Sequence, residues 1–254
     1  MAAEPANPFR LDGKAALVTG AGRGIGRAVA LALAAAGAEL AVNSRTPAEL
    51  DMLVGEIAAA GGRARALPFD VTDSEAARAA IAGLSRLDIL VNNAGMNRPQ
   101  PFLEVDDATL DRMIALNIKA AFVVAQAAAR RMIEAGAGVI VNMSSQMGHV
   151  GSERNRTAYV MTKHAIEGLT KAMAVELAPK GVRVVSIAPT FVMTPLTKPF
   201  FDEPATRKWI IDRIPLGRAG TVEEVANAVV FLASPAAGLV TGSSLLADGG
   251  WTAW

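Results

Sequence analysis

The chain contains a single tyrosine, Tyr159, and Lys163 follows it by four residues. Both lie in a strongly helical stretch, "TAYVMTKHA", so their side chains rise from the same face of a helix. A free phenol has a pKa of about 10 and exchanges protons slowly at neutral pH. A neighbouring ammonium favours the phenolate and lowers that pKa, which suits general acid–base catalysis. The spacing alone is also compatible with a core tyrosine beside a surface lysine.

Two serines, Ser144 and Ser145, end the apolar run "GVIVNMSS". The run is predicted to form a strand, and open α/β sheets bind ligands at the carboxyl ends of their strands. A serine hydroxyl at that edge can donate a hydrogen bond to a carbonyl oxygen that gains negative charge as hydride arrives. The serines therefore give the tyrosine and lysine a chemically sensible neighbour.

A glycine-rich turn, "TGAGRGIG" at residues 19–26, follows the first predicted strand and opens the first predicted helix. Glycines let the backbone approach a pyrophosphate, whose charge then lies on the free N–H groups of the helix N-terminus. This context indicates a dinucleotide-binding turn. Because the spacing of Gly20, Gly24 and Gly26 is not G-x-G-x-x-G, a simple tight turn is the alternative interpretation.

The second predicted strand ends in "NSR", so Ser44 and Arg45 stand where NAD-binding sites carry an acidic residue for the ribose 2′-hydroxyl. Arg45 and Arg23 could instead neutralise a 2′-phosphate with charge-assisted hydrogen bonds. The sequence therefore favours NADP(H) over NAD(H), although either arginine alone could be a solvated surface charge.

Short β-rich runs alternate with longer alanine-rich helical stretches, which predicts an α/β fold with a parallel sheet. Residues 1–254 are expected to form one domain. Residues 190–218 interrupt the alternation with an irregular segment rich in Pro and Phe, which we interpret as a lid. Strands are expected at residues 15–20, 40–45, 65–71, 88–95, 138–145, 182–189 and 243–250, and helices at 25–36, 47–60, 74–84, 108–135, 157–178 and 222–232.

The composition excludes several classes of function. Of 254 residues, 52% are hydrophobic and 19% charged, which suits a packed globule. The net charge of +1, without a basic run, makes nucleic acid a poor partner, and the absence of cysteine excludes disulfides and thiolate chemistry. The longest apolar stretch, residues 120–129, is shorter than the roughly 18 residues that span a bilayer. We therefore expect a cytoplasmic protein with neither a membrane partner nor a catalytic metal.

Taken together, the motifs resemble those of the short-chain dehydrogenase/reductase family in order and spacing, from Leu11 to the C-terminus. They are "TGAGRGIG", "NNAG" at residues 92–95, the serine-ended strand, "YVMTK" at residues 159–163 and "PTFVMT" at residues 189–194. The resemblance implies a single Rossmann-type doubly wound domain with a seven-stranded parallel sheet, usually assembled as a homotetramer.

The resemblance also implies roles for individual residues. Tyr159 would be the general acid–base, and Lys163 would lower its pKa and bind the nicotinamide ribose. Ser145 would orient the substrate carbonyl, and we prefer it to Ser144 because it directly precedes the turn "QMG". Asn117 matches an asparagine that holds a water in the proton relay. The remaining cofactor contacts would be Gly20, Arg23, Gly24, Ile25 and Gly26 with Ser44 and Arg45, then Asp70 and Val71 at the adenine, Asn93, Ala94 and Gly95 at the adenosine ribose, and Val192 and Thr194 at the carboxamide.

Two departures from the family pattern concern the substrate side. Thr190 stands where the family often has glycine, and the stretch from Ser145 to Tyr159 is one residue longer than in many members. That stretch is polar and basic, and Gln146 is its best candidate for a substrate contact. The aromatic residues of the lid are Phe200, Phe201 and Trp209. They could serve as apolar cover or as a subunit contact.

The pattern looks most like members that act on the carbonyl or alcohol group of sugars, sugar acids and polyols. Reduction of a 3-oxoacyl thioester is the alternative within the family. A non-catalytic dinucleotide-binding sensor is the alternative of another class, and the presence of Asn117, Ser145, Tyr159 and Lys163 opposes it.

Overall fold

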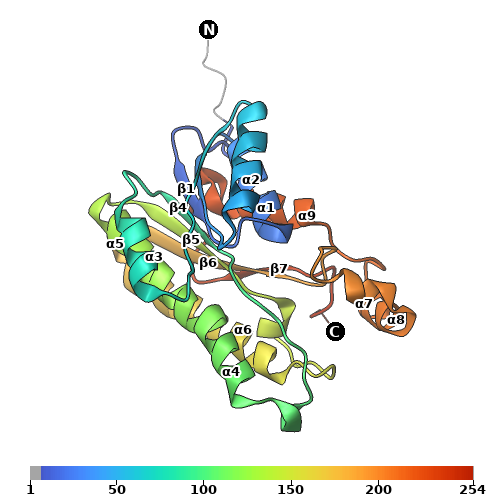
Figure 1. Cartoon of the computed structure of the whole chain (residues 1–254). Coiled ribbons are helices and arrows are strands. Elements are labelled where there is room, and N and C mark those ends of the chain that lie inside the picture. Colours follow the sequence, from blue (N-terminus) through green and yellow to red (C-terminus); the bar gives the residue numbers. More distant parts are fainter. Residues whose placement is uncertain (1–6, 254) are drawn as a thin grey trace.

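Seven parallel strands form the centre of the protein, in the order β3-β2-β1-β4-β5-β6-β7 (Figure 1). The computed structural model describes residues 7–253. The strands are β1 (Ala15–Val18), β2 (Glu39–Val42), β3 (Arg63–Ala66), β4 (Ile89–Asn92), β5 (Gly138–Met143), β6 (Val182–Pro189) and β7 (Ser244–Ala247). The strand order reverses direction between β1 and β4, where doubly wound sheets bind their ligands. The predicted fold class is confirmed.

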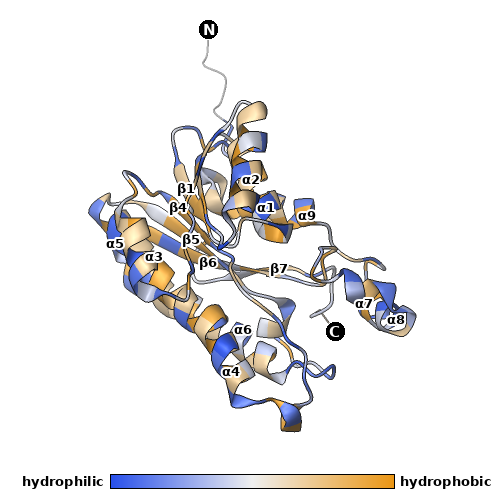
Figure 2. Ribbon diagram, viewed as in Figure 1, coloured by the Kyte–Doolittle hydropathy of each residue, from blue (hydrophilic) through white to orange (hydrophobic). Residues whose placement is uncertain are grey.

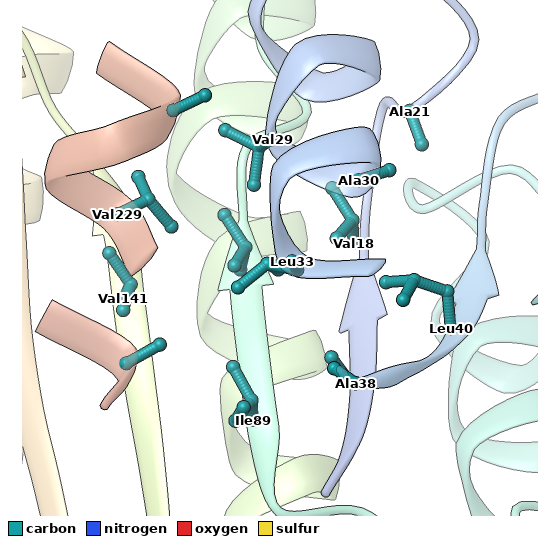
Figure 3. Packing of buried hydrophobic residues seen from close by; sticks show 14 of the residues in the cluster. Val18, Ala21, Val29, Ala30, Leu33, Ala38, Leu40, Ile89, Val141 and Val229 are labelled. Atoms are coloured by element: carbon teal, nitrogen blue, oxygen red, sulfur yellow. The ribbon is translucent and has the colours of Figure 1, made fainter. Parts of the chain in front are cut away.

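Helices cover both faces of this sheet (Figure 1). One layer contains α1 (Gly24–Ala35), α2 (Pro47–Ala59) and α9 (Val222–Ala233), and the other contains α3 (Ser74–Ala82), α5 (Ala121–Glu134) and α6 (Thr157–Leu177). Because side chains alternate along a strand, Val18 of β1 packs in the first layer and Leu17 in the second. Figure 3 shows the first layer, with Val29 and Leu33 on α1 close to Val229 on α9.

The central strands are apolar on both sides, as expected of a sheet buried between two layers. All four residues of β4 are buried, and β1 and β4 are coloured as hydrophobic strands (Figure 2). The largest fully buried side chains, such as Leu17, Leu90 and Ile140, come mainly from strands and from the helix faces that cover them. This rigid centre fixes the carboxyl ends of β1, β4 and β5 relative to one another.

A long helical stretch runs from α4 (Asp107–Ile114) through a π-helical segment (Ala115–Ala120) into α5. By length and composition alone, this 28-residue stretch could cross a membrane. An 18-residue part of it has a mean hydropathy of 1.3, and half of that part is buried inside the molecule. Within the fold, α5 packs against α3, β4 and β5. Its apolar face therefore belongs to the core of the sheet.

Several predicted strands are shorter in the structure, and the third is also shifted toward the N-terminus. The third strand was expected at residues 65–71 but is Arg63–Ala66, because Pro68 has no N–H group for the ladder. The carbonyl groups of Leu67 and Phe69 instead accept hydrogen bonds from the Asn43 side chain, both at 3.0 Å.

Residues 190–218 were expected to be irregular, yet they contain α7 (Lys198–Asp202) and α8 (Pro204–Asp212). The Glu203 carboxylate caps α8 by accepting hydrogen bonds from the backbone of Ala205 and Thr206. In Figure 1, these two helices lie apart from the sheet, on the side of the molecule where the C-terminus ends.

The lid aromatics pack within the chain itself. Trp209 of α8 meets Trp251 of the C-terminal tail edge to face, with ring centres 5.5 Å apart, and both rings pack against Phe191. The Trp209 indole donates a hydrogen bond to Glu153 at 2.6 Å. Trp209 therefore contributes apolar cover within the chain, and the interpretation of the lid aromatics as a subunit contact stays a prediction.

Candidate active site

A cleft of about 840 Å³ lies along the carboxyl ends of the strands. Every site residue predicted from the sequence lines this cleft except Asn117, which lies behind its wall. A smaller groove of about 500 Å³ between α1 and α9 is mostly apolar and contains none of the candidate catalytic residues. The larger cleft therefore contains the candidate catalytic and cofactor-binding residues, and its volume is typical of small-molecule sites.

The glycine-rich turn forms one end of the cleft and leads into the N-terminus of α1. A Cβ atom at Gly26 would overlap the carbonyl oxygen of Gly20 and crowd Asn93. Gly24 has a φ of +57°, in the left-handed region that glycine tolerates best. Thr194 lies within van der Waals reach of this glycine. The turn is thus a tightly closed cradle beside free helix N–H groups, and it fits a dinucleotide pyrophosphate.

Thr19 joins this turn to the "NNAG" segment, and sequence reasoning missed it. Its hydroxyl accepts hydrogen bonds from the backbone N–H groups of Asn93 and Ala94, at 3.0 and 3.1 Å. The Asn93 amide in turn donates to the carbonyl groups of Thr19 and Gly20, at 2.9 and 3.2 Å. These mutual bonds lock two loops from β1 and β4 into one wall of the cleft.

Charged side chains line the cleft near the end of β2. Arg23 and Arg45 are both exposed there, and Arg45 lies 3.7 Å from the Asp70 carboxylate. Burial acts to raise the pKa of Asp70, but hydrogen bonds from Thr72 and the Arg45 charge hold that pKa below its usual value. Glu49 of α2 lies against Gly22 in the same region.

Tyr159 and Lys163 stand on one face of α6 at the other end of the cleft. The Lys163 ammonium lies 5.6 Å from the centre of the Tyr159 ring and donates a 2.8 Å hydrogen bond to the Met143 carbonyl. Burial lowers the pKa of Lys163 to about 8, and Glu167 one turn further along the helix opposes this shift. The lysine is therefore anchored to β5 while remaining beside the phenol.

The pKa of Tyr159 moves in the direction opposite to the one expected from its lysine neighbour. Burial raises this pKa above its usual value, while a hydrogen bond with Ser145 and the charge of Arg156 act to lower it. The ring is only half-buried, because one side of it faces the cleft. The phenol in this structure is therefore a proton donor, held protonated at neutral pH.

Of the two serines at the end of β5, Ser145 carries the contact with the phenol. Its hydroxyl also accepts a hydrogen bond from the Met147 backbone at 3.2 Å, which fixes the side chain. The Ser144 hydroxyl is buried against Gly148 and has no hydrogen-bond partner among the described residues. A carbonyl oxygen placed beside Tyr159 would therefore meet a second donor in Ser145.

Asn117 lies in the π-helical turn and is 2% exposed. Its amide donates to the Met96 carbonyl at 2.8 Å and to the Thr162 hydroxyl at 3.1 Å, and its oxygen accepts from the Met96 N–H at 2.9 Å. This side chain ties the segment after "NNAG" to α6, and π-helical turns of this kind often mark functional sites. Thr162, which the sequence reasoning missed, completes the link by donating to the Tyr159 carbonyl at 2.8 Å.

Several buried polar atoms of the cleft have no hydrogen-bond partner within residues 7–253. Besides the Ser144 hydroxyl, they are the side-chain oxygens of Asn97, Gln146 and Thr190 and the Nε atom of Arg156. Such atoms are rare in folded proteins and usually meet a ligand or water. Thr190, the departure noted in the sequence, has a negative φ, so the threonine leaves the backbone in its ordinary region.

No cluster of three or more His, Cys, Asp or Glu side chains within residues 7–253 is arranged to hold a metal ion. His149 contacts a buried carboxylate and a hydroxyl. Its Nε2 atom lies 3.3 Å from Glu167 and 3.0 Å from Ser244. The histidine therefore belongs to the polar network behind Lys163.

Comparisons with known proteins agree with this geometry. A family model described as enoyl-(acyl carrier protein) reductase matches residues 20–252. The chain is 45% identical over 246 residues to an L-xylulose reductase of Bos taurus, covering 96% of this chain and 99% of the relative. It is 43% identical over 250 residues to a galactitol 2-dehydrogenase (L-tagatose-forming) of Cereibacter sphaeroides, covering 97% and 98%.

Among solved structures, the chain is similar to a gluconate 5-dehydrogenase of Burkholderia cenocepacia J2315 in complex with NADP and tartrate. The TM-score is 0.94 at 38% identity, and the similarity covers 97% of this chain and 98% of that one. The family model and these relatives are named for different substrates. The names of the relatives therefore do not define one substrate for this chain.

Proposed function

The chain belongs to the short-chain dehydrogenase/reductase family and is an NAD(P)-dependent oxidoreductase, and we propose that it interconverts a secondary alcohol and a ketone on a sugar, sugar acid or polyol with NADP(H). The observation that carries the proposal is the meeting of Ser145, Tyr159 and Lys163 at one end of a cleft whose other end is a glycine cradle. The relatives named above support the sugar and polyol class.

The residues that would hold the dinucleotide are those of the glycine turn, the end of β2, the "NNAG" segment and Lys163. When bound, the nicotinamide supplies hydride to the carbonyl carbon or accepts it from the alcohol carbon. Tyr159 donates its proton to the carbonyl oxygen in the reductive direction, and a forming alkoxide is a much stronger base than a phenolate. Ser145 donates a hydrogen bond to the same oxygen and holds it beside the phenol.

In this proposal, Lys163 and Asn117 help to return a proton to Tyr159 after it has protonated the substrate. The lysine is fixed on the Met143 carbonyl and places positive charge near the phenolate that remains after proton transfer. Asn117 holds the Met96 backbone against α6, and we propose that a water beside it refills the proton. In the oxidative direction each proton movement reverses.

NADP(H) is the proposed cofactor because of the charge near the end of β2. A 2′-phosphate there would meet the guanidinium groups of Arg23 and Arg45. Two carboxylates, Glu49 and Asp70, line the same region, but Asp70 already faces Arg45. No carboxylate occupies position 44 to bind the 2′-hydroxyl and repel the phosphate.

A sugar-like substrate is supported by the orphaned oxygens of the cleft. Asn97, Gln146 and Thr190 line the cleft, and each has a buried side-chain oxygen that meets no donor within residues 7–253. Substrate hydroxyls can donate to such atoms, whereas the acyl chain of a thioester would leave them unpaired at a cost of about 1–3 kcal/mol each. The polar lining therefore favours a polyhydroxylated substrate over an acyl thioester.

An absorbance assay at the nicotinamide band tests the proposal. Purified protein is given NADPH or NADH with neutral ketoses, oxo-sugar acids and an acetoacetyl thioester, and NADP⁺ or NAD⁺ with polyols and sugar acids. We expect turnover of at least one sugar-type class. Turnover of the thioester alone would replace the proposed substrate class by the alternative, and the absence of any turnover would favour a sensor.

We also propose a homotetramer that acts in the cytoplasm, where the cofactor is available. Apolar side chains on the outer faces support assembly, since Phe122 of α5, Val175 of α6 and Leu246 of β7 are all substantially exposed. Light scattering after size exclusion should give about four times the chain mass of 26.3 kDa. A mass of one chain would reject the tetramer, and cell fractionation tests the location.

A further inference from the structure

Arg156 is a buried cation at the chemical end of the cleft. Only 6% of the residue is exposed, yet it lines the cleft together with Tyr159. Within residues 7–253, its side chain makes no hydrogen bond and no ion pair, and its Nε atom is fully enclosed without a partner. Buried charges without a partner are costly in proteins and call for a compensating group.

Two aromatic rings hold the guanidinium in place. Its central carbon lies 5.1 Å from the centre of the Phe191 ring and 4.9 Å from that of Phe200. Such cation–π contacts orient the planar group but leave its N–H donors unused. The side chain is therefore fixed and still able to bind a ligand.

The backbone of Arg156 occupies a position that rarely carries a basic residue. Arg156 occupies the N-cap position of α6, a site that prefers Ser, Thr, Asp or Asn and carries the positive end of the helix dipole. The preceding Asn155 adopts a φ of +56°, the only positive φ of a non-glycine residue within residues 7–253, and its carbonyl accepts a hydrogen bond from Gln100. This turn therefore places a basic residue at a position where an acidic or small polar residue is the usual choice.

The carboxylates nearby already have other partners. Glu153, three residues earlier on the loop, accepts hydrogen bonds from Arg213 and Trp209, both at 2.6 Å. Glu203 caps α8. Burial lowers the pKa of Arg156, which agrees with a charge that lacks its counterion.

We propose that Arg156 is a specificity-determining residue that binds the carboxylate of the substrate, so that oxo-sugar acids are preferred to neutral ketoses. The planar guanidinium can grip a carboxylate with two parallel hydrogen bonds. The orphaned oxygens of Gln146 and Thr190 then take the substrate hydroxyls. This inference rests on the proposed function and selects one class within it.

The test compares kcat/KM for reduction of 5-oxo-gluconate and other oxo-hexonates with that for neutral ketohexoses. Assays run with NADPH at pH 7, where Tyr159 is protonated, and any effect of Arg156 on the phenol would change turnover of the acid and neutral substrates alike. Wild type should prefer the best oxo acid by at least about tenfold, and Arg156→Gln should lower the ratio of acid to neutral turnover by about 100-fold, mainly through KM. Arg156→Lys should fall between them.

Arg154→Gln is the matched control, because Arg154 lies on the same loop, is exposed and stacks on Trp209 outside the cleft. It should keep the wild-type ratio. NADPH binding, followed by fluorescence, reports whether each variant is folded. If Arg156→Gln does not bind NADPH, the ratio of acid to neutral turnover in Arg156→Lys decides the question. A second readout is competitive inhibition of the wild type by tartrate, which should exceed inhibition by the neutral polyol erythritol.

The proposal is overturned if wild type reduces neutral ketoses as well as oxo acids, or if Arg156→Gln lowers both to the same extent. The latter result would mean that Arg156 acts through Tyr159 rather than on the substrate. A failure of the proposed function gives a different result, since wild type would then reduce neither sugar class.

Discussion

The ammonium nitrogen of Lys163 lies 5.6 Å from the centre of the Tyr159 ring, while its hydrogen bond goes to the backbone carbonyl of Met143. The lysine thus influences the phenol through its charge and not through a direct hydrogen bond. Burial acts on both groups, raising the pKa of the phenol and lowering that of the ammonium to about 8. This arrangement favours a protonated Tyr159 beside a charged Lys163 at neutral pH, which is the state needed for carbonyl reduction.

The pH dependence of reduction should report Lys163. Below pH about 8 the lysine is charged, and kcat/KM for reduction should fall as pH rises through that value. Glu167 raises the lysine pKa by stabilising the charge, so Glu167→Gln should move the fall to lower pH, by roughly one unit or less. Steady-state profiles from pH 6 to 10 measure the shift. An unchanged pH profile would contradict the claim that Glu167 raises the pKa of Lys163.

Alcohol oxidation should have the opposite pH dependence. In that direction Tyr159 must lose its proton, and its pKa is raised by burial. The fraction of phenolate therefore increases with pH, and the rate of oxidation should climb throughout the alkaline range in which the protein stays folded. A rate that declines from pH 7 upward would contradict the raised pKa.

Ser145→Ala should lower kcat for reduction by about 10²–10³-fold, because one donor to the developing oxyanion is lost. Ser144→Ala is the matched control, since that hydroxyl is buried against Gly148 and has no hydrogen-bond partner among the described residues. It should change kcat little. Equal losses in the two variants would show that the effect comes from the strand and not from the Ser145 hydroxyl.

Arg45→Ala should reduce kcat/KM for NADPH by roughly 10- to 100-fold and leave that for NADH much less affected, because charge-assisted hydrogen bonds to a phosphate are lost. Arg63→Ala serves as a control for removing an exposed arginine, since Arg63 pairs with Glu39 outside the cleft. Initial rates with both cofactors give the ratio. A wild-type preference for NADH would refute the assignment of NADP(H).

Much of the site could be predicted from the sequence because its parts are coded locally. A glycine turn between a strand and a helix, serines at a strand end and a tyrosine and lysine four apart each predict their own geometry. The sheet brings these parts together whenever the strands are parallel, as they are here. The caps of α8 were also readable, since Glu203 directly precedes a proline, but the aromatic content of the segment suggested an irregular lid.

The remaining features depend on contacts between distant segments. Thr19 and Thr162 lie inside the motifs "TGAGRGIG" and "YVMTK", but their roles depend on hydrogen-bond partners on other elements, which the motifs do not reveal. Arg156 stands out because no carboxylate among the described residues pairs with its guanidinium. That absence can be seen only in the folded chain. The pKa of Tyr159 was likewise set by burial, a property of the whole cleft and not of the helix that carries the residue.

The most direct test of the account is single-turnover reduction by Tyr159→Phe, followed at the nicotinamide band together with NADPH affinity. The substitution removes only the hydroxyl, so NADPH should bind with nearly wild-type affinity, while the rate of the hydride step should fall by about 10²–10⁴-fold. A rate close to that of wild type, with the cofactor bound normally, would contradict the claim that the Tyr159 hydroxyl delivers the proton.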